Sequence, residues 1–119
     1  MRDHRKLKAF QLADALVLAV YKATKVFPRD EQFGITSQLR RAAVSVAANI
    51  VEGSARSSEK DYSKFLGIAF ASLREAGYLI ELACKLGYLA APASEDLLGQ
   101  YDQCARVLSG LVSSFRDGA

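Results

Sequence analysis

Histidine is almost absent from this sequence, because His4, in the N-terminal tail, is the only one among 119 residues. A carboxylate-bridged metal site in a helical bundle needs Glu-x-x-His pairs on its helices, so that class of metalloprotein is excluded. There is also no G-x-S-x-G turn for a serine nucleophile and no G-x-x-x-x-G-K-[ST] phosphate-binding loop. We therefore predict that the protein is not an enzyme and holds no metal or other cofactor.

Cysteine is scarce too, and long apolar runs are missing. Cys84 and Cys104 have no C-x-x-C spacing that would indicate a zinc site, so we interpret both as reduced, buried thiols. No apolar run approaches the roughly eighteen residues of a membrane span. The N-terminus imitates a signal peptide only weakly, since Gln11 and Asp14 interrupt its apolar stretch. These features predict a cytoplasmic protein without a membrane partner.

Positive charge is unevenly distributed along the chain. The net charge of the chain is only +3. Residues 1–64, however, carry twelve basic and seven acidic side chains, whereas residues 65–119 carry four basic and six acidic ones. A polyanion would therefore prefer the first half of the chain. The alternative is a solvated surface whose asymmetry arose by chance.

Hydrophobic residues recur at alternating steps of three and four, the spacing of helices, and no stretch alternates as a strand does. This spacing predicts helices at approximately residues 7–26, 34–53, 58–87 and 93–116. Phe27-Pro28 ends the first, Gly53 is a candidate terminator of the second, and Ser58 and Ser94 are candidate N-caps of the third and fourth.

Each predicted helix has one apolar seam. The seams are Phe10, Ala13, Val17, Val20, Thr24 and Phe27; then Ile35, Leu39, Ala42, Val46 and Ile50; then Tyr62, Leu66, Ala69, Leu73, Ala76, Ile80 and Ala83; and finally Leu97, Tyr101, Cys104, Leu108, Leu111 and Phe115. Short connections favour antiparallel neighbours. The predicted fold is all-α, one domain over residues 1–119, an antiparallel up-down-up-down four-helix bundle.

The second and third helices have more apolar surface than one bundle core requires. Opposite the seam of the second helix lie Val44, Ala47, Ala48 and Val51, and beside the seam of the third lie Phe65, Ile68, Leu79, Leu82 and Leu86. A helix that is apolar on two sides is normally buried on both, so we expect a homo-oligomer that buries Val44, Ala47, Ala48, Val51, Phe65 and Ile68. The alternative is a wide core stripe.

Polar residues also align on the second helix. Gln38, Ser45 and Glu52 are seven apart, with Arg41 and Asn49 alongside. They form either a binding stripe or an internal hydrogen-bond network that sets the helix register, since buried polar groups usually satisfy one another. A DNA-reading helix-turn-helix needs an exposed polar recognition helix, and the valines and alanines here fit that role poorly.

Three stretches carry a resemblance to a known family. The stretch "FPRDEQFGITSQLRRAAVSVAANIVEGSARS", Phe27 to Ser57, and the later "FLGIAFASLREA" and "LGYL" strongly resemble the four-helix-bundle proteins encoded by intervening sequences in bacterial 23S ribosomal RNA genes. The resemblance spans nearly the whole chain. One departure is Ala47, where the family commonly has a proline that would kink the helix. The most specific part is the pattern Gln38, Arg41, Ala42, Ser45, Asn49, Glu52 and Gly53.

The resemblance implies a small cytoplasmic protein associated with ribosomal RNA, without enzymatic activity, whose relatives assemble as ring-shaped homopentamers. The accessory variability determinant of diversity-generating retroelements is similar in fold and more distant, and it binds nucleic acid and a reverse transcriptase.

These observations together predict an oligomeric scaffold that binds RNA through backbone phosphates. Aromatic stacking is expected to contribute little, because Phe and Tyr mostly occupy helix seams, so binding should depend on salt and hardly on sequence. The alternative is an adaptor that binds a protein partner and no nucleic acid. The candidate phosphate contacts are Arg2, Arg5, Lys6, Lys8, Arg40, Arg41, Arg56, Lys60 and Lys64.

Overall fold

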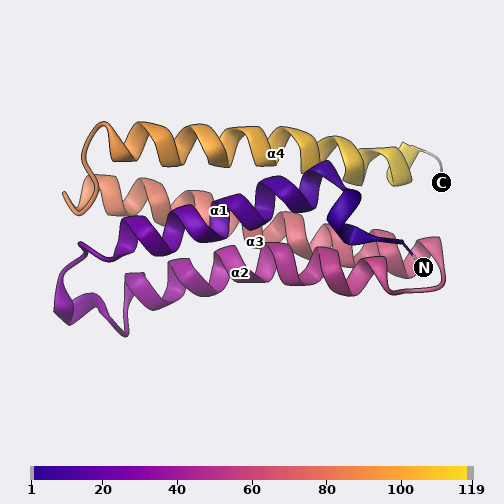
Figure 1. Ribbon diagram of the computed structural model, residues 1–119, viewed down its shortest axis with the longest axis horizontal. Coiled ribbons are helices and arrows are strands. Elements are labelled where there is room, and N and C mark those ends of the chain that lie inside the picture. The colour runs from indigo at the N-terminus through magenta and orange to yellow at the C-terminus, as the bar shows by residue number, and fades with distance from the viewer. Residues whose placement is uncertain (1, 118–119) are drawn as a thin grey trace.

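The computed structural model describes the backbone of residues 2–117 and the side chains of residues 2–115 (Figure 1). Its four long helices are α1 Lys8–Thr24, α2 Ile35–Ser54, α3 Glu59–Lys85 and α4 Ala93–Asp117. The short 3-10 helix η1 His4–Lys6 precedes α1, and η2 Arg29–Glu31 lies between α1 and α2. Residues 2–117 contain no strand, so the all-α prediction is confirmed. The observed bounds of the long helices differ from the predicted ranges by at most two residues.

The four helices lie along one long axis, in a body of 44 × 23 × 21 Å. α2 packs between α1 and α3, and α4 packs against both α3 and α1. In Figure 1 the start of the chain and the α2–α3 connection lie at one end, which we call the N-terminal end, and the α1–α2 and α3–α4 connections lie at the other, the far end. None of the helices in residues 2–117 has the length and hydrophobicity to span a bilayer.

The core is built from the apolar seams. Every predicted seam residue of α2 and α3 is buried. On α1 the prediction was partly wrong, because Ala9 and Leu16 are buried while Phe10 and Val17 are only partly covered. α1 packs against α2 on one side and α4 on the other, so the face directed between these two neighbours is the one that is buried.

The helix ends follow local side-chain chemistry. Ser58 caps α3 as predicted, because its Oγ accepts a hydrogen bond from the Asp61 N–H at 3.1 Å. Ser94 does not cap α4: the helix begins at Ala93, and the Ser94 N–H donates to the carbonyl of Ala90 at 3.1 Å. Gly53 does not end α2, which continues to Ser54.

Gly53 has a packing role instead. A Cβ at this position would lie 2.9 Å from Cβ of Phe65 and 3.2 Å from Cδ1 of Tyr62. The absence of a side chain therefore lets α3 approach the last turn of α2 closely.

Candidate functional site

Basic residues from two separate parts of the sequence meet at the N-terminal end of the bundle. The Arg2 N–H donates to the Ser54 carbonyl at 3.1 Å, and the Arg2 guanidinium lies 3.9 Å from the centroid of the Tyr62 ring. These contacts hold the N-terminal tail beside the α2–α3 connection. We call the resulting cluster the basic end; its members are Arg2, Arg5, Lys6, Lys8, Arg56, Lys60 and Lys64.

Acidic side chains balance part of this charge. Arg5 pairs with Asp3 at 3.0 Å, and Arg56 approaches Glu52 at 3.9 Å while its guanidinium lies over the Phe65 ring at 4.7 Å. The hydrogen bond from Arg5 lowers the pKa of Asp3 below its usual value. With Glu59 and Asp61 also at this end, seven basic residues face four acidic ones. The remaining positive excess is suited to phosphate contacts.

Two predicted phosphate contacts lie elsewhere. Arg40 and Arg41 are in the first two turns of α2, roughly 20 Å along the helix from Ser54. Arg40 is engaged internally, because its Nε donates to Thr24 Oγ1 at 2.8 Å and its guanidinium covers the Tyr21 ring at 4.6 Å. Arg41 points to a different side of α2, so the nine candidate residues do not form a single surface.

The aligned polar residues of α2 divide into two groups. Ser45 Oγ bonds Ser72 Oγ of α3 at 2.8 Å, and Asn49 Nδ2 donates to the carbonyl and Oγ of Ser45 at 2.8 and 3.0 Å. This cluster links α2 to α3 as the register interpretation predicted. Gln38 and Glu52 are exposed instead, and Glu52 lies beside Arg56 of the basic end.

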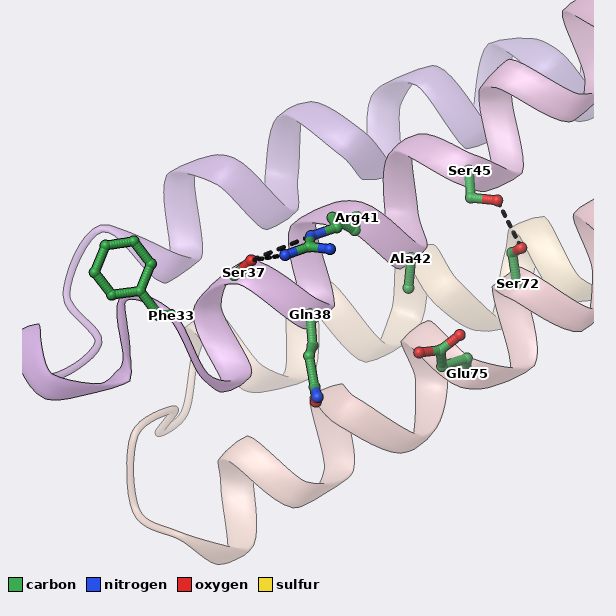
Figure 2. A pocket seen from close by; sticks show the side chains of 8 residues that line it. All are labelled: Phe33, Ser37, Gln38, Arg41, Ala42, Ser45, Ser72 and Glu75. Carbon is green, nitrogen blue, oxygen red and sulfur yellow. Dashed lines mark hydrogen bonds between the residues drawn. The ribbon is translucent and has the colours of Figure 1, made fainter.

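A hollow of about 400 Å³ lies between α2 and α3 (Figure 2), and we call it the α2–α3 hollow. Arg41 lines it, with Nε and Nη2 donating to Ser37 Oγ at 3.3 and 3.1 Å. Glu75 lines the opposite wall and is exposed. The lining residues are Phe33, Ser37, Gln38, Arg41, Ala42, Ser45, Ser72 and Glu75.

Phe33 is the functional candidate that sequence reasoning missed. Its side chain is 90% exposed at one end of the α2–α3 hollow, although aromatic residues were expected to be occupied in the helix seams. The available signal was its position: Phe33 stands in the α1–α2 connection beside Gly34, outside every hydrophobic repeat. An exposed aromatic ring is a surface on which a planar ligand can stack.

The predicted oligomer surface is largely exposed on the outer side of α2 and α3. Val44 and Val51 are 40% and 36% exposed, and Ala48 and Ile68 are exposed as well. Ala47, however, is half-buried against the core, because it lies on the side of α2 that faces α1. Half-buried Phe65 is covered in part by Arg56. In the second row of α3, Leu79 is buried and Leu82 packs on the core, so a wide core stripe explains that part.

The far end has a second hollow, of about 730 Å³ and mainly apolar. The end of α1, the α3–α4 connection and the start of α4 form its walls. Val26 stands at its rim with 78% of its surface exposed, while Lys22 and Asp96 add one charge of each sign. Its apolar lining residues include Ala19, Ala23, Val26, Leu89, Pro92 and Leu97.

The two cysteines are free thiols in different surroundings. Cys104 is buried in the core, and burial raises the pKa of its thiol to about 11, so it stays protonated at neutral pH. Cys84 is only half-buried, which corrects the expectation for this residue, and both cysteines are free. His4 stands edge-on against Phe10, with 4.7 Å between ring centroids.

Comparison with known proteins identifies a solved structure with the same fold and a protein family that matches this sequence. A crystal structure described as a protein with unknown function from the S23 ribosomal protein family of Bacteroides thetaiotaomicron VPI-5482 superimposes with a TM-score of 0.80, covering 87% of this chain and 97% of that chain at 20% sequence identity. No curated protein matches. The family of 23S rRNA-intervening sequence proteins matches residues 5–110. Since this match covers most of the sequence, the chain belongs to the 23S rRNA-intervening sequence protein family.

Proposed function

We propose that this protein is a non-enzymatic cytoplasmic scaffold, an up-down-up-down four-helix bundle that assembles as a homo-oligomer and binds RNA through its basic end. The observation that carries the proposal is the attachment of the N-terminal tail to the α2–α3 connection through Arg2, Ser54 and Tyr62. This attachment joins two basic segments into one cluster on a rigid support. Because the family is defined by intervening sequences of 23S rRNA genes, 23S rRNA is the first RNA to test.

Assembly would strengthen such binding. The exposed Val44, Val51 and Ile68 supply apolar surface whose burial contributes about 25 cal/mol per Å² before the costs of association. The family resemblance implies five subunits. A homopentamer would present five basic ends to one RNA, and simultaneous contacts convert weak binding into strong binding when the geometry allows them.

Binding through phosphates has a salt signature that tests the proposal. We expect the affinity for a fragment of 23S rRNA, measured by fluorescence anisotropy, to fall at least about tenfold between 50 and 200 mM salt. The double substitution of Lys60→Glu and Lys64→Glu, two exposed lysines of the basic end, should weaken binding and reduce the slope of log affinity against log salt by about two.

A matched control comes from the other end of the molecule. Lys22→Glu and Lys25→Glu change the same number of exposed lysines at the end of α1 and should leave the affinity nearly unchanged. Equal losses in the two double variants, or no binding at 50 mM salt, would contradict binding by the basic end.

An adaptor function is the second candidate, and the apolar hollow at the far end favours it. The purified protein would be incubated in parallel with 23S rRNA fragments and with cell lysate. If the protein is an adaptor, repeated incubations should capture the same lysate protein, and the Val26→Asp variant should no longer capture it. The adaptor should also bind no RNA at low salt. RNA binding together with capture unaffected by Val26→Asp would reject this candidate.

A further inference from the structure

The α2–α3 hollow has a preorganised floor. The hydrogen bond between Ser45 and Ser72 links α2 to α3, and the two bonds from Asn49 to Ser45, within α2, hold the Ser45 side chain in place. The volume of about 400 Å³ is within the range of small-molecule sites. The backbone positions of the α2 and α3 residues that line the hollow are therefore fixed relative to each other around an open space.

The charged groups of the hollow have capacity left for a ligand. Among the described side chains, Glu75 makes no ion pair and no hydrogen bond, and Arg41 is held only by Ser37, through Nε and Nη2. Arg41 Nη1 is thus available as a donor, and the carboxylate of Glu75 as a pair of acceptors. In the hollow, Arg41 can therefore donate a hydrogen bond to an anion. Glu75 can accept hydrogen bonds from a ligand group that carries several donors.

Phe33 adds a stacking surface that is separate from Glu75. Figure 2 shows Phe33 at one end of the hollow, Glu75 beside Ala42 at the other, and Gln38 between them. The rise of α2 from Ile35 to Ala42 alone is about 10 Å, so one base cannot touch both Phe33 and Glu75. Two successive nucleotides can span this distance, with their phosphate near Arg41.

The chemistry at Glu75 selects one base. Single-stranded RNA is read by stacking on aromatic side chains and by hydrogen bonds to Watson–Crick edges. Among the four bases, only guanine presents two adjacent donors there, N1–H and the N2 amino group, which match the two oxygens of a carboxylate. The Gln38 amide can donate to the neighbouring O6.

We propose that the α2–α3 hollow binds two consecutive nucleotides of single-stranded RNA, one base stacking on Phe33 and the next, guanine, pairing with Glu75 and Gln38. The inference rests on the proposed RNA-binding function and adds a sequence preference that the basic end lacks. The basic end supplies affinity for any strand, and the hollow selects a guanine-containing segment.

Four labelled eight-nucleotide RNAs test this inference. One is oligouridine, and in each of the other three the two central uridines are replaced by a pair of G, A or C. Anisotropy titrations of the oligomeric protein at 50 mM salt should show the G-containing RNA bound about tenfold more tightly than the others, the lower range for a bidentate base contact. Glu75→Gln should abolish this preference, so that the G-containing RNA binds no more tightly than the other three. Phe33→Leu should weaken binding of all four by about tenfold through loss of stacking.

Two controls separate the hollow from the basic end. Glu81→Gln removes the charge of another exposed glutamate of α3 and should leave the preference intact. Lys60→Glu with Lys64→Glu should weaken all four RNAs by the same factor. Circular dichroism should show unchanged helix content for every variant, because the substituted side chains are exposed.

Three outcomes would overturn the inference. Equal affinity of the unaltered protein for all four RNAs would show that the hollow does not recognise guanine. The proposal of salt-dependent binding by the basic end would be unaffected. No binding of any RNA would remove both proposals. A lower oligomer mass for Phe33→Leu, with unchanged RNA affinity, would assign the hollow to contact between copies of the chain.

Discussion

The guanidinium of Arg2 lies 3.9 Å from the ring centroid of Tyr62, and the Arg2 N–H donates to Ser54. The tail is thereby part of the folded unit. Arg2→Ala should lower the free energy of unfolding by about 0.5–1 kcal/mol, the usual contribution of a cation–π pair, as measured by urea denaturation. Arg5→Ala is the control, since the exposed Arg5 side chain pairs with Asp3 and the Arg5 carbonyl that accepts from Gln11 is retained in the variant, so stability should change much less. Similar losses for both variants would contradict this role of Arg2.

Arg40 and Arg41 are adjacent in sequence but should respond oppositely to substitution. Arg40→Ala removes the 2.8 Å bond to Thr24 and the contact with Tyr21, so we expect thermal and urea unfolding to show a loss of about 1–2 kcal/mol with RNA affinity retained. Arg41→Ala should change stability by less than about 0.5 kcal/mol and reduce RNA affinity. Loss of RNA affinity without loss of stability in the Arg40 variant would reverse this assignment.

Two glycines of α3 should have opposite effects when replaced by alanine. A Cβ on Gly77 would overlap the Tyr101 ring of α4, whereas no atom lies within 4 Å of one on Gly67. Gly77→Ala should therefore destabilise the bundle by about 1–3 kcal/mol, and Gly67→Ala should stabilise it by about 0.5–1 kcal/mol through helix propensity. Chemical denaturation of both variants measures the difference, and a stabilising effect of Gly77→Ala would show that the α3–α4 approach is not tight.

Charge placed on the outer side of α2 should dissociate the proposed oligomer. Val44→Asp with Val51→Asp changes two exposed valines, so helix content by circular dichroism should persist while light scattering shows the mass of one 12.9 kDa chain. Leu18→Asp, on exposed α1 surface, is the matched control and should leave the mass unchanged. A monomeric unaltered protein at micromolar concentration would refute assembly itself.

Cys104 should contribute a pH-dependent part of stability. Burial raises its pKa from 9.0 to about 11, so the folded state holds the proton more tightly than the unfolded state. The contribution is fully present below about pH 9 and is lost as pH rises toward 11, by up to about 1.4 kcal/mol per pH unit. The unfolding free energy of the unaltered protein should fall more steeply over this range than that of Cys104→Ala. Parallel curves would show that the thiol does not titrate in this way.

Much of the fold follows from the sequence alone. The repeats of α2 and α3 identified the buried face residue by residue, because a helix rotates by a constant angle per residue and only one stripe can face a core. The cap at Ser58 was also predictable, since it depends on a hydrogen bond to a residue three positions away. Such local interactions are complete within a few residues and need no knowledge of the neighbouring helices.

The tertiary structure decided which distant residues meet. In the packed bundle the buried face of α1 includes Ala9 and Leu16, and Gly53 allows α3 to pack closely against α2. Arg40 contacts Thr24 of α1, whereas Arg41 lies on a different side of α2. The tertiary structure also left Phe33 exposed at the opposite end of the α2–α3 hollow from Glu75, and it brought Arg2 to Tyr62, sixty residues away in sequence. Periodicity determines the direction of a side chain around its own helix axis, but the partner it meets depends on how neighbouring helices are rotated and spaced, which only the packed bundle determines.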